Sequence, residues 1–270
     1  MIIYFDDLAI GGEDIADINN IKKLLSDCFK MKDMKELHYF LGIEATQTPN
    51  YIMISQRHYI LHLLYEFGMT ECKSMATPLD RNLRLDVDYD TTECKLTRYR
   101  QLVGSLIYLT ITQPDLCYLV GLLSQFMQTP RNIHLDCAKK VLRYVSGTMN
   151  YGILYKSAMT IPIEGTQMPT RLARKTTHDQ PPIWSFGSGA IPWSNKKRPT
   201  VSLSITEAEY RDAAVVACEV IWLKRILKDL DISVKDPIIL YCDIQNNIHL
   251  AQNLVFHDRT KHIKVHYHFI

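Results

Sequence analysis

The 270-residue sequence lacks the features that mark secreted, membrane-spanning or disordered proteins. Its seven cysteines are an odd number without a Cys-x-x-Cys pair, which is typical of free thiols in a reducing compartment. No apolar run approaches the ~20 residues that a membrane helix needs. The first residues have neither the basic start nor the apolar length of a signal peptide. We therefore expect a soluble intracellular protein, of the cytoplasm or the nucleus, with no membrane partner.

A charge excess of one sign is also absent. The sequence has 31 Lys and Arg against 29 Asp and Glu, so no strong basic field indicates a nucleic-acid partner. A nucleic-acid enzyme can nevertheless concentrate its basic residues in one channel. Hydrophobic residues make up 47% and charged residues 22%, which is typical of a folded chain with a core. The length allows two modest domains.

The pattern of apolar residues predicts alternating strands and helices. Strands are expected in a hairpin over 1–10 and at 38–44, 51–55, 183–186, 190–194 and 238–242, and helices at 14–28, 57–67, 99–111, 114–127, 132–146, 206–230 and 245–253. Thr206, with Glu209 three residues later, is typical of a helix N-cap with a capping box. Residues 79–95 are acidic and polar and predict a linker. Residues 157–183 hold four prolines and few long apolar residues, so we expect a loop or disordered insertion there.

Asp6 and Asp7 are the first residues with a chemical interpretation. They interrupt two apolar stretches, so we expect them at the tip of a β-hairpin. Two adjacent carboxylates on a tight turn can bind a divalent metal ion, and a metal pair can stabilise both the attacking and the leaving oxygen of phosphoryl transfer. An Asp-Asp pair is more often a solvated turn. The pair alone does not decide between these interpretations.

Glu209 and Asp243 form a second candidate pair. Glu209 lies in the first turns of an expected helix, and Asp243 follows an expected strand, where a carboxylate can serve as a metal ligand. Both also have a structural interpretation, because helix N-termini favour acidic side chains and Asp is a common N-cap.

Histidines and basic pairs near these residues carry weaker signals. His257, His262, His266 and His268 have no cysteine close by and match no standard zinc spacing, so we do not expect a zinc site. The basic pairs Lys139-Lys140 and Lys196-Lys197-Arg198 can contact phosphates, although solvation at the surface is the commoner role of such pairs.

Several longer stretches carry a family resemblance. Phe5-Asp6-Asp7, with branched apolar residues on both sides, resembles the Tyr-x-Asp-Asp palm motif of reverse transcriptases. Similarity to copia-type retrotransposon Pol polyproteins continues, in order, through LHYFLGIEA (37–45), ISQRHYILHLLYEFGM (54–69), ATPLD (76–80), YRQLVGSLIYLT (99–110), QPDLCYLVGLLSQFM (113–127), VLRYVSGTMNYGILY (141–155), WSNKKRPTVSLSITEAEYRDAA (193–214) and RTKHI (259–263). The resemblance covers nearly the whole chain.

The resemblance implies an α/β (α+β) chain of two parts. Residues 1–156 correspond to the end of a reverse-transcriptase palm with its helical thumb and connection. Residues 157–183 are a degenerate loop in place of the first ribonuclease H strand, and 184–270 form a ribonuclease H-like domain. The implied metal is Mg²⁺ or Mn²⁺, and the implied partners are a primer–template and an RNA/DNA hybrid.

The same resemblance assigns the candidate carboxylates to two catalytic centres. Asp6 and Asp7 correspond to two palm carboxylates, while Glu209 and Asp243 correspond to two of four ribonuclease H carboxylates. The third palm carboxylate lies on a strand upstream in the family, so we expect this chain to lack it and to be inactive as a polymerase.

Two positions depart from the family pattern. The family carries Ser-Asp-Ala-Asp on the first ribonuclease H strand, after a turn similar to Glu164-Gly165, and this chain has Thr166-Gln167-Met168-Pro169-Thr170 there. Lys264 stands where an acidic residue is expected. We therefore expect a catalytically inactive remnant that binds metal poorly. The alternatives are a non-catalytic nucleic-acid-binding module, or residual hybrid cleavage in which Asp179 replaces a missing carboxylate.

The first departure has a genetic interpretation. Residues 166–170 can be encoded by ACT CAG ATG CCG ACT. Read one base upstream, with a preceding T, this becomes TAC TCA GAT GCC GAC, which encodes Tyr-Ser-Asp-Ala-Asp. A frameshifted pseudogene would then explain the composition of 157–183, although residues 171–177 require a further lesion. The alternative is a natural divergent loop.

Overall fold

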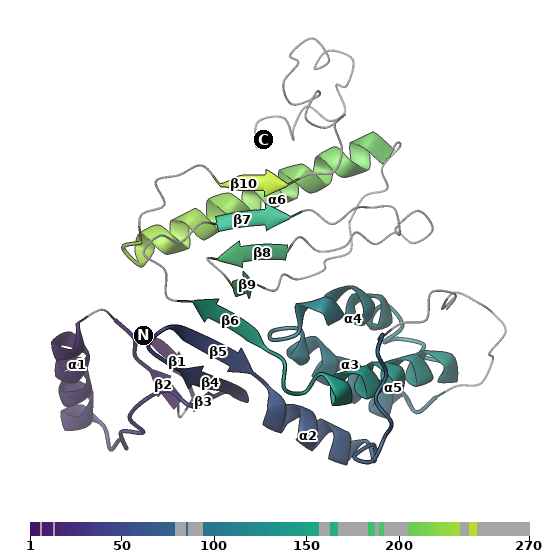
Figure 1. Cartoon of the computed structure of the whole chain (residues 1–270), viewed down its shortest axis with the longest axis horizontal. Helices are drawn as coiled ribbons and strands as arrows, with labels where there is room; N and C mark the ends of the chain where they lie inside the picture. Colours follow the sequence, from purple (N-terminus) through teal and green to yellow (C-terminus); the bar gives the residue numbers. More distant parts are fainter. Residues whose placement is uncertain are drawn as a thin grey trace, which may run out of the picture.

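The computed structural model describes residues 1–5, 7–12, 14–78, 85, 94–156, 163–166, 183–186, 189–191, 205–232 and 238–241. Within these residues the chain forms a hairpin, two four-stranded sheets and a group of helices (Figure 1). The mixed helix-and-sheet class predicted from the sequence is confirmed. None of the helices in this part of the chain has the length and apolar character needed to cross a bilayer.

The chain opens with a hairpin and a helix. Strands β1 (Ile2–Tyr4) and β2 (Asp7–Ala9) pair antiparallel, and helix α1 (Ile15–Cys28) follows. The Asp14 side chain accepts a hydrogen bond of 2.7 Å from the backbone N–H of Ala16, which caps the first turn of α1. The hairpin and helix predicted for these residues are confirmed.

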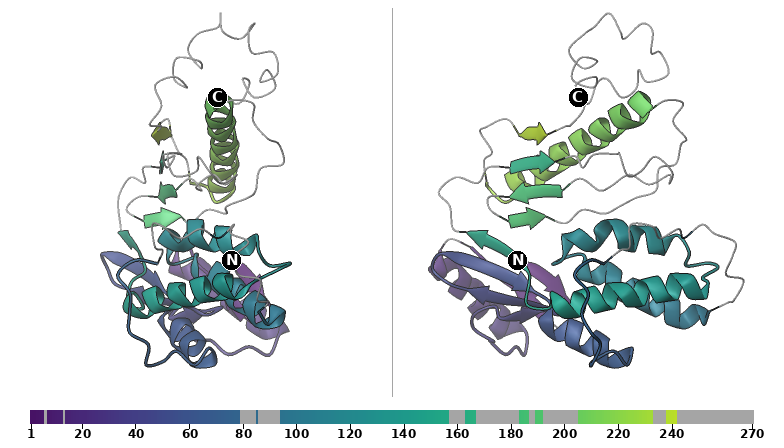
Figure 2. Two further views of the ribbon diagram at one scale, coloured as in Figure 1. Left: turned by 90° about the vertical axis from the view of Figure 1, so that its right-hand side faces the viewer. Right: turned by 45° about the vertical axis from the view of Figure 1, so that its right-hand side comes forward.

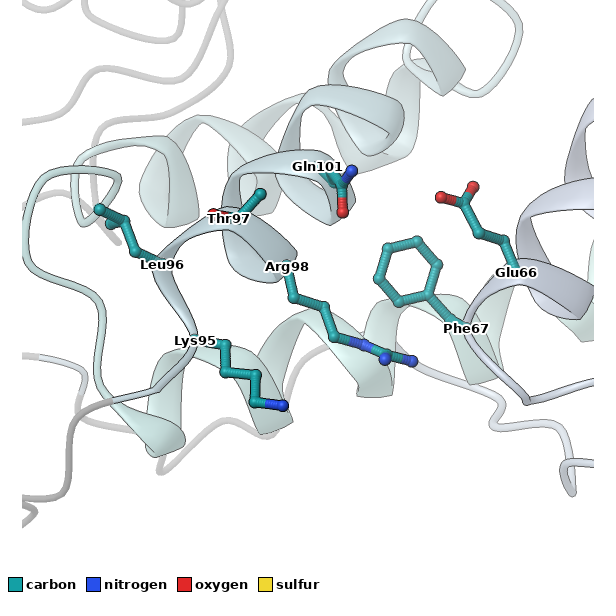
Figure 3. Close-up of a pocket in the computed structure, with 7 residues that line it drawn as sticks. All are labelled: Glu66, Phe67, Lys95, Leu96, Thr97, Arg98 and Gln101. Carbon is teal, nitrogen blue, oxygen red and sulfur yellow. The ribbon is translucent and has the colours of Figure 1, made fainter.

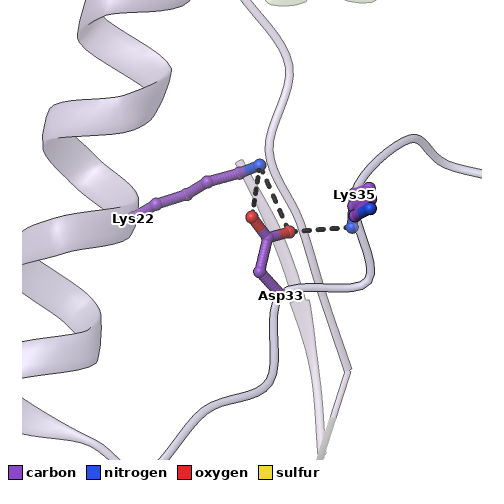
Figure 4. Close-up of polar contacts among 3 residues, drawn as sticks. All are labelled: Lys22, Asp33 and Lys35. Carbon is purple, nitrogen blue, oxygen red and sulfur yellow. Dashed lines mark hydrogen bonds and ion pairs between the residues drawn. The ribbon is translucent and has the colours of Figure 1, made fainter.

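A carboxylate holds the chain after α1 against that helix. The Nζ of Lys22 donates to both oxygens of Asp33, at 3.2 and 3.3 Å, and the backbone N–H of Lys35 donates at 2.8 Å (Figure 4). Lys35 has a left-handed φ of 68°, a conformation that an Asp side chain two residues earlier stabilises in turns. The Lys35 N–H first, and Lys22 second, hold the pKa of the Asp33 carboxyl below its ordinary value.

The first four-stranded sheet has the strand order β3-β4-β5-β6, with antiparallel neighbours throughout. Its strands are β3 (Tyr39–Phe40), β4 (Ile43–Gln47), β5 (Tyr51–Ser55) and β6 (Ile153–Lys156). The helices between β5 and β6 separate two neighbouring strands by about a hundred residues.

The single strand predicted at 38–44 is wrong. Leu41 and Gly42 both adopt positive φ, at 51° and 82°, so the chain turns there and forms β3 and β4 instead. The hydroxyl of Tyr108 donates to the Leu41 carbonyl oxygen, and it would lie 3.4 Å from a Cβ placed on Gly42. A glycine at this position therefore fits both the backbone conformation and the close approach of the ring.

The main core lies among the helices. These are α2 (Arg57–Glu66), α3 (Leu96–Leu109), the 3₁₀ turn η1 (Pro114–Leu116), α4 (Cys117–Ser124) and α5 (Asn132–Gly147). The helix predicted at 114–127 is confirmed in part, because its proline-led first turn is 3₁₀ and its α-helix ends at Ser124. The helix predicted at 132–146 is confirmed as α5, and the apolar residues Cys137, Val141, Leu142 and Val145 on one face of it are all buried.

A buried polar cluster joins three helix ends. The Thr112 hydroxyl donates to the side-chain oxygen of Gln56 at 2.8 Å, just before α2 begins. The Gln113 side-chain amide donates to the Thr148 carbonyl oxygen at 3.0 Å, just after α5 ends. These polar groups have lost their contacts with water, so a shift of one helix end that broke either bond would leave a buried group unpaired. The bonds therefore hold the helix ends in fixed relative positions.

The second sheet has the order β10-β7-β8-β9. Its strands are β7 (Ile163–Thr166), β8 (Ile183–Phe186), β9 (Gly189–Ile191) and β10 (Ile239–Tyr241). β7, β8 and β9 are antiparallel, whereas β10 runs parallel to β7. Helix α6 (Ile205–Asp229) joins β9 to β10 and lies along one face of this sheet (Figures 1 and 2).

Two predictions for this half are wrong. β7 lies inside the segment 157–183, where we expected a loop, because pairing with β8 and β10 stabilises a strand that composition alone disfavours. Helix α6 begins at Ile205, so Thr206 lies inside the helix and is not its N-cap. The helix predicted at 245–253 lies outside the described residues.

The two sheets meet at their edges. β9 runs next to β6, as Figure 1 shows, so the last strand of the first sheet contacts the edge of the second.

Candidate functional site

The hairpin tip is as tight as a β-hairpin allows. Tyr4 pairs with Asp7, so the paired strands are only two positions apart in sequence, and the structure describes the first of these, Phe5. Phe5 has a φ of 41°, the positive value that primed two-residue turns require at this position. A bulky residue with positive φ is a strained feature of the kind that accumulates at functional sites. The predicted hairpin is confirmed, with Asp7 at the start of β2 and Asp6 outside the described residues.

Tyrosines connect this hairpin to the helices. The ring of Tyr108 on α3 meets that of Tyr59 on α2 edge to face, with centroids 5.1 Å apart. Burial first, then the nearby phenols of Tyr59, Tyr39 and Tyr4, raise the pKa of Tyr108, and a hydrogen bond with Gln56 partly opposes this rise. Tyr4 at the end of β1 therefore lies near the same tyrosine that holds the β3–β4 turn.

The hairpin tip itself is open to solvent. The side chain of Phe5 is 90% exposed, and Asp7 is also exposed. Among the described residues no group of three His, Cys, Asp or Glu side chains could hold a metal ion. Metal binding by Asp6 and Asp7 therefore stays a prediction.

The second candidate site is built on the parallel pair of strands. Thr166, the last residue of β7, pairs with Tyr241, the last residue of β10. The carboxyl ends of these two parallel strands therefore lie side by side. Glu164 and Gly165 lie within β7, and the turn expected there is wrong. Glu209 lies in α6, whose backbone is described there.

The other residues considered for a metal site fall outside the described residues. These are the carboxylates of Asp243 and Asp179, the lysine at 264 that stands in place of an acid, and the histidines at 257, 262, 266 and 268, for which we expect no zinc. The distance between the carboxylates of Glu209 and Asp243 therefore stays a prediction. Of the basic pairs, Lys139 lies 3.7 Å from the Asp136 carboxylate on its own helix, which offsets part of its charge. The second pair, at 196–198, is outside the described residues.

A pocket that sequence reasoning missed lies between the end of α2 and the start of α3. It has a volume of about 520 Å³ and is lined by Glu66, Phe67, Lys95, Leu96, Thr97, Arg98 and Gln101 (Figure 3). The sequence carries only one signal for it, which is the pair of basic residues beginning a helix directly after an acidic linker.

Comparison with known proteins agrees with the hairpin and the order of motifs. Residues 1–81 match the family described as reverse transcriptase (RNA-dependent DNA polymerase). All of the chain aligns with the retrovirus-related Pol polyprotein from transposon RE1 of Arabidopsis thaliana, at 40% identity. An uncharacterized mitochondrial protein of the same plant is 36% identical over 82% of this chain and 93% of its own length. The chain belongs to the reverse-transcriptase family of retrotransposon Pol polyproteins. The resemblance to copia-type Pol polyproteins predicted from the sequence is thereby confirmed.

The match to the full polyproteins is partial in length. The Pol polyprotein from transposon TNT 1-94 of Nicotiana tabacum is 34% identical over the whole of this chain. The chain spans about a fifth of the length of these polyproteins, 19% for RE1 and 21% for TNT 1-94. No solved structure matches the chain at a significant level.

Proposed function

We propose that this chain is the part of a copia-type Pol protein that runs from the palm hairpin into a ribonuclease H-like domain. In this proposal residues 1–156 carry the end of the palm with its thumb and connection, and 184–270, together with β7, carry the ribonuclease H-like domain. Its partner is nucleic acid, an RNA/DNA hybrid or a primer–template, as in the reverse-transcriptase family.

The arrangement of the second sheet supports the ribonuclease H-like part. Three antiparallel strands are followed by a crossover helix and a fourth strand parallel to the first. Such a crossover places a helix against the sheet and brings the ends of two adjacent strands together. A carboxylate two residues beyond β10, Asp243, and one on the crossover helix, Glu209, are thus on elements that can share a metal pair.

The residues present do not fit a complete two-metal centre. Met168 stands two residues beyond β7, as Asp243 stands two beyond β10, and the resemblance implies a carboxylate at 168. Lys264 stands where the fourth carboxylate is expected, and Thr170 stands at the second aspartate of the family's Ser-Asp-Ala-Asp motif. Hard divalent cations need several anionic oxygens, so two carboxylates alone bind Mg²⁺ or Mn²⁺ weakly. The positive charge of a lysine near them weakens that binding further. We therefore propose that the chain binds hybrids without cleaving them.

A cleavage assay with a restored variant tests both parts of this proposal. The parent chain with Mg²⁺ or Mn²⁺ should not cleave an RNA/DNA hybrid above background. The triple variant Met168→Asp, Thr170→Asp, Lys264→Asp should cleave it, and a further Glu209→Gln substitution should abolish that cleavage. The matched control replaces the same three residues with Asn, which has a similar size but no charge. Cleavage by the parent that is lost in Glu209→Gln would refute the inactive assignment.

The second candidate function is residual hybrid cleavage in which Asp179 substitutes for a missing acid. It predicts parent activity that an Asp179→Asn variant loses, so the same assay separates it from the inactive form.

We also propose an intracellular location. The cysteines of the described residues are all free thiols, and two of them, Cys28 and Cys218, are exposed. Exposed free thiols persist in reducing compartments and become oxidised outside them. Locating a tagged chain in cells by microscopy tests this directly, and detection in the secreted fraction would refute it.

A further inference from the structure

The pocket between α2 and α3 has two basic side chains on one side. In Figure 3 the Arg98 guanidinium lies directly below the Phe67 ring, the Lys95 ammonium lies farther to the lower left, and the Glu66 carboxylate lies above the ring. The ion pairs found among the described residues involve neither Lys95 nor Arg98. The positive charge at this end of the pocket is therefore available to a ligand.

An aromatic ring fixes the guanidinium in place. The Arg98 guanidinium carbon lies 5.4 Å from the centroid of Phe67, within cation–π distance. Phe67 is only 8% exposed because it packs into the core formed by the helices, so the ring is a rigid support. A guanidinium held on such a support loses little rotamer entropy when it binds, and its planar fork matches the oxygens of a phosphate.

The start of α3 adds to the positive electrostatic potential that Lys95 and Arg98 produce in the pocket. No side chain of the described residues caps this 14-residue helix, whose first residues Leu96, Thr97 and Arg98 line the pocket. Their backbone N–H groups carry the positive end of the helix dipole, which favours a negative group beside the two cations.

We propose that this pocket binds a phosphate group of a nucleic-acid backbone. The inference rests on the proposed function, in that it takes nucleic acid as the partner of the chain. The pocket opens to solvent, so a polymer can cross it, whereas a small anion would keep much of its surface in water. Lys95 and Arg98 are therefore positioning residues that hold a strand, and they take no part in chemistry.

The test measures how binding depends on salt. The dissociation constant of a fluorescent RNA/DNA hybrid is measured by anisotropy at several salt concentrations for the full chain and for the Lys95→Gln, Arg98→Gln double variant. The pocket predicts about tenfold weaker binding at low salt and a salt slope smaller in magnitude by about 1, because each phosphate contact contributes roughly 0.9 to that slope. Both side chains are exposed, so we expect the variant to fold, and its circular dichroism spectrum checks this.

A matched control removes the same charge elsewhere. Lys23→Gln with Lys30→Gln changes the net charge equally, but these exposed lysines belong to α1 and the segment after it. This control should bind nearly as tightly as the parent and keep its slope. The single variant Arg98→Lys keeps the charge but loses the fork, and it should fall between the parent and the double variant.

The possible outcomes distinguish a failure of the pocket inference from a failure of the proposed function. If the parent binds the hybrid but the pocket variant matches the control in slope and affinity, the pocket inference is wrong and the proposed function stands. If the parent binds no nucleic acid, the proposed function fails and takes this inference with it. A third outcome is that inorganic phosphate raises the melting temperature of the parent but not of the double variant, while the parent and the double variant bind the hybrid equally. The ligand of the pocket is then a free phosphate, and the nucleic-acid assignment is wrong.

Discussion

Replacing Gly152 with alanine should detach strand β6 from the first sheet. Gly152 directly precedes β6, and a Cβ there would overlap the Ile54 carbonyl oxygen on β5. It would also lie 3.1 Å from the carbonyl carbon of Ile54 and from the Cβ of Ser55. These neighbours are backbone atoms or are fixed to the backbone, so relief requires the two strands to separate.

The expected loss follows from what β6 contributes. Ile153 pairs with Ile54 and is only 5% exposed, so its burial contributes about 1.5 to 3 kcal/mol. An overpacked site that relaxes by a backbone shift loses about 1 to 3 kcal/mol. These estimates describe the same displacement and are not additive, so we expect Gly152→Ala to lower the free energy of unfolding by about 1.5 to 3 kcal/mol.

A second glycine provides the control. Gly104 is exposed on α3, and open space surrounds the position that an added methyl group would take, so Gly104→Ala should stabilise the chain by up to about 1 kcal/mol through helix propensity. Urea denaturation followed by far-UV circular dichroism measures both variants, and amide hydrogen exchange of β5 and β6 locates the effect. If Gly152→Ala unfolds within about 0.5 kcal/mol of the parent, the close approach of these strands is wrong.

Four further predictions follow from other parts of the chain. Tyr99→Phe removes a buried hydroxyl that donates to a carbonyl oxygen of α4 at 2.7 Å, and it should cost about 0.5 to 1.5 kcal/mol in urea denaturation; an unchanged midpoint would contradict the bond. At pH 7.5 a maleimide should label exposed Cys28 but not Cys137, because burial raises the pKa of that thiol to about 11; rapid labelling of Cys137 in the folded chain would contradict this. The lowered pKa of Asp33 means that its contacts stabilise the fold above the ordinary pKa near 3.8 and are lost as pH falls through the lowered value. Asp33→Asn should therefore weaken the chain at pH 6, and this difference in urea denaturation should shrink as pH is lowered below 3.8; a difference that does not depend on pH would contradict it. Sequencing of the gene should show codons for 166–170 that encode Asp-x-Asp in the shifted frame, and their absence would leave divergence as the explanation.

Local sequence patterns predicted the elements whose structure depends on near neighbours. The apolar face of α5 and the hairpin around Phe5-Asp6-Asp7 each follow from residues within one helix or one turn. The turn at Leu41-Gly42 escaped prediction because its apolar flanks look like one strand, and Tyr108, which holds it, lies far along the chain. β7 escaped for a similar reason, since its partner β10 lies beyond a 25-residue helix.

The candidate sites also differ in whether they depend on local sequence or on contacts between distant residues. Asp6, Asp7, Glu209 and Asp243 were assigned by motif resemblance, which depends only on the order and spacing of residues in the sequence, and their role as metal ligands stays a prediction. The pocket of Lys95 and Arg98 depends on packing α3 against Phe67 at the end of α2, about thirty residues earlier. No periodicity within either helix predicts that contact.

Strand β6 is synthesised long after its partner β5, and this delay affects how the chain folds during synthesis. β5 leaves the ribosome about a hundred residues before its partner strand, a delay of roughly 5 to 20 seconds at ordinary rates of synthesis. During that time one edge of β5 carries unpaired backbone groups, which are a template for pairing with other chains. The hydrogen bonds of Gln56, Thr112 and Gln113 involve only residues that precede β6, so they can hold the helix ends together before β6 is synthesised. Nascent chains that stall within the helices would therefore expose an unpaired strand edge, and protection by a chaperone matters most in that interval.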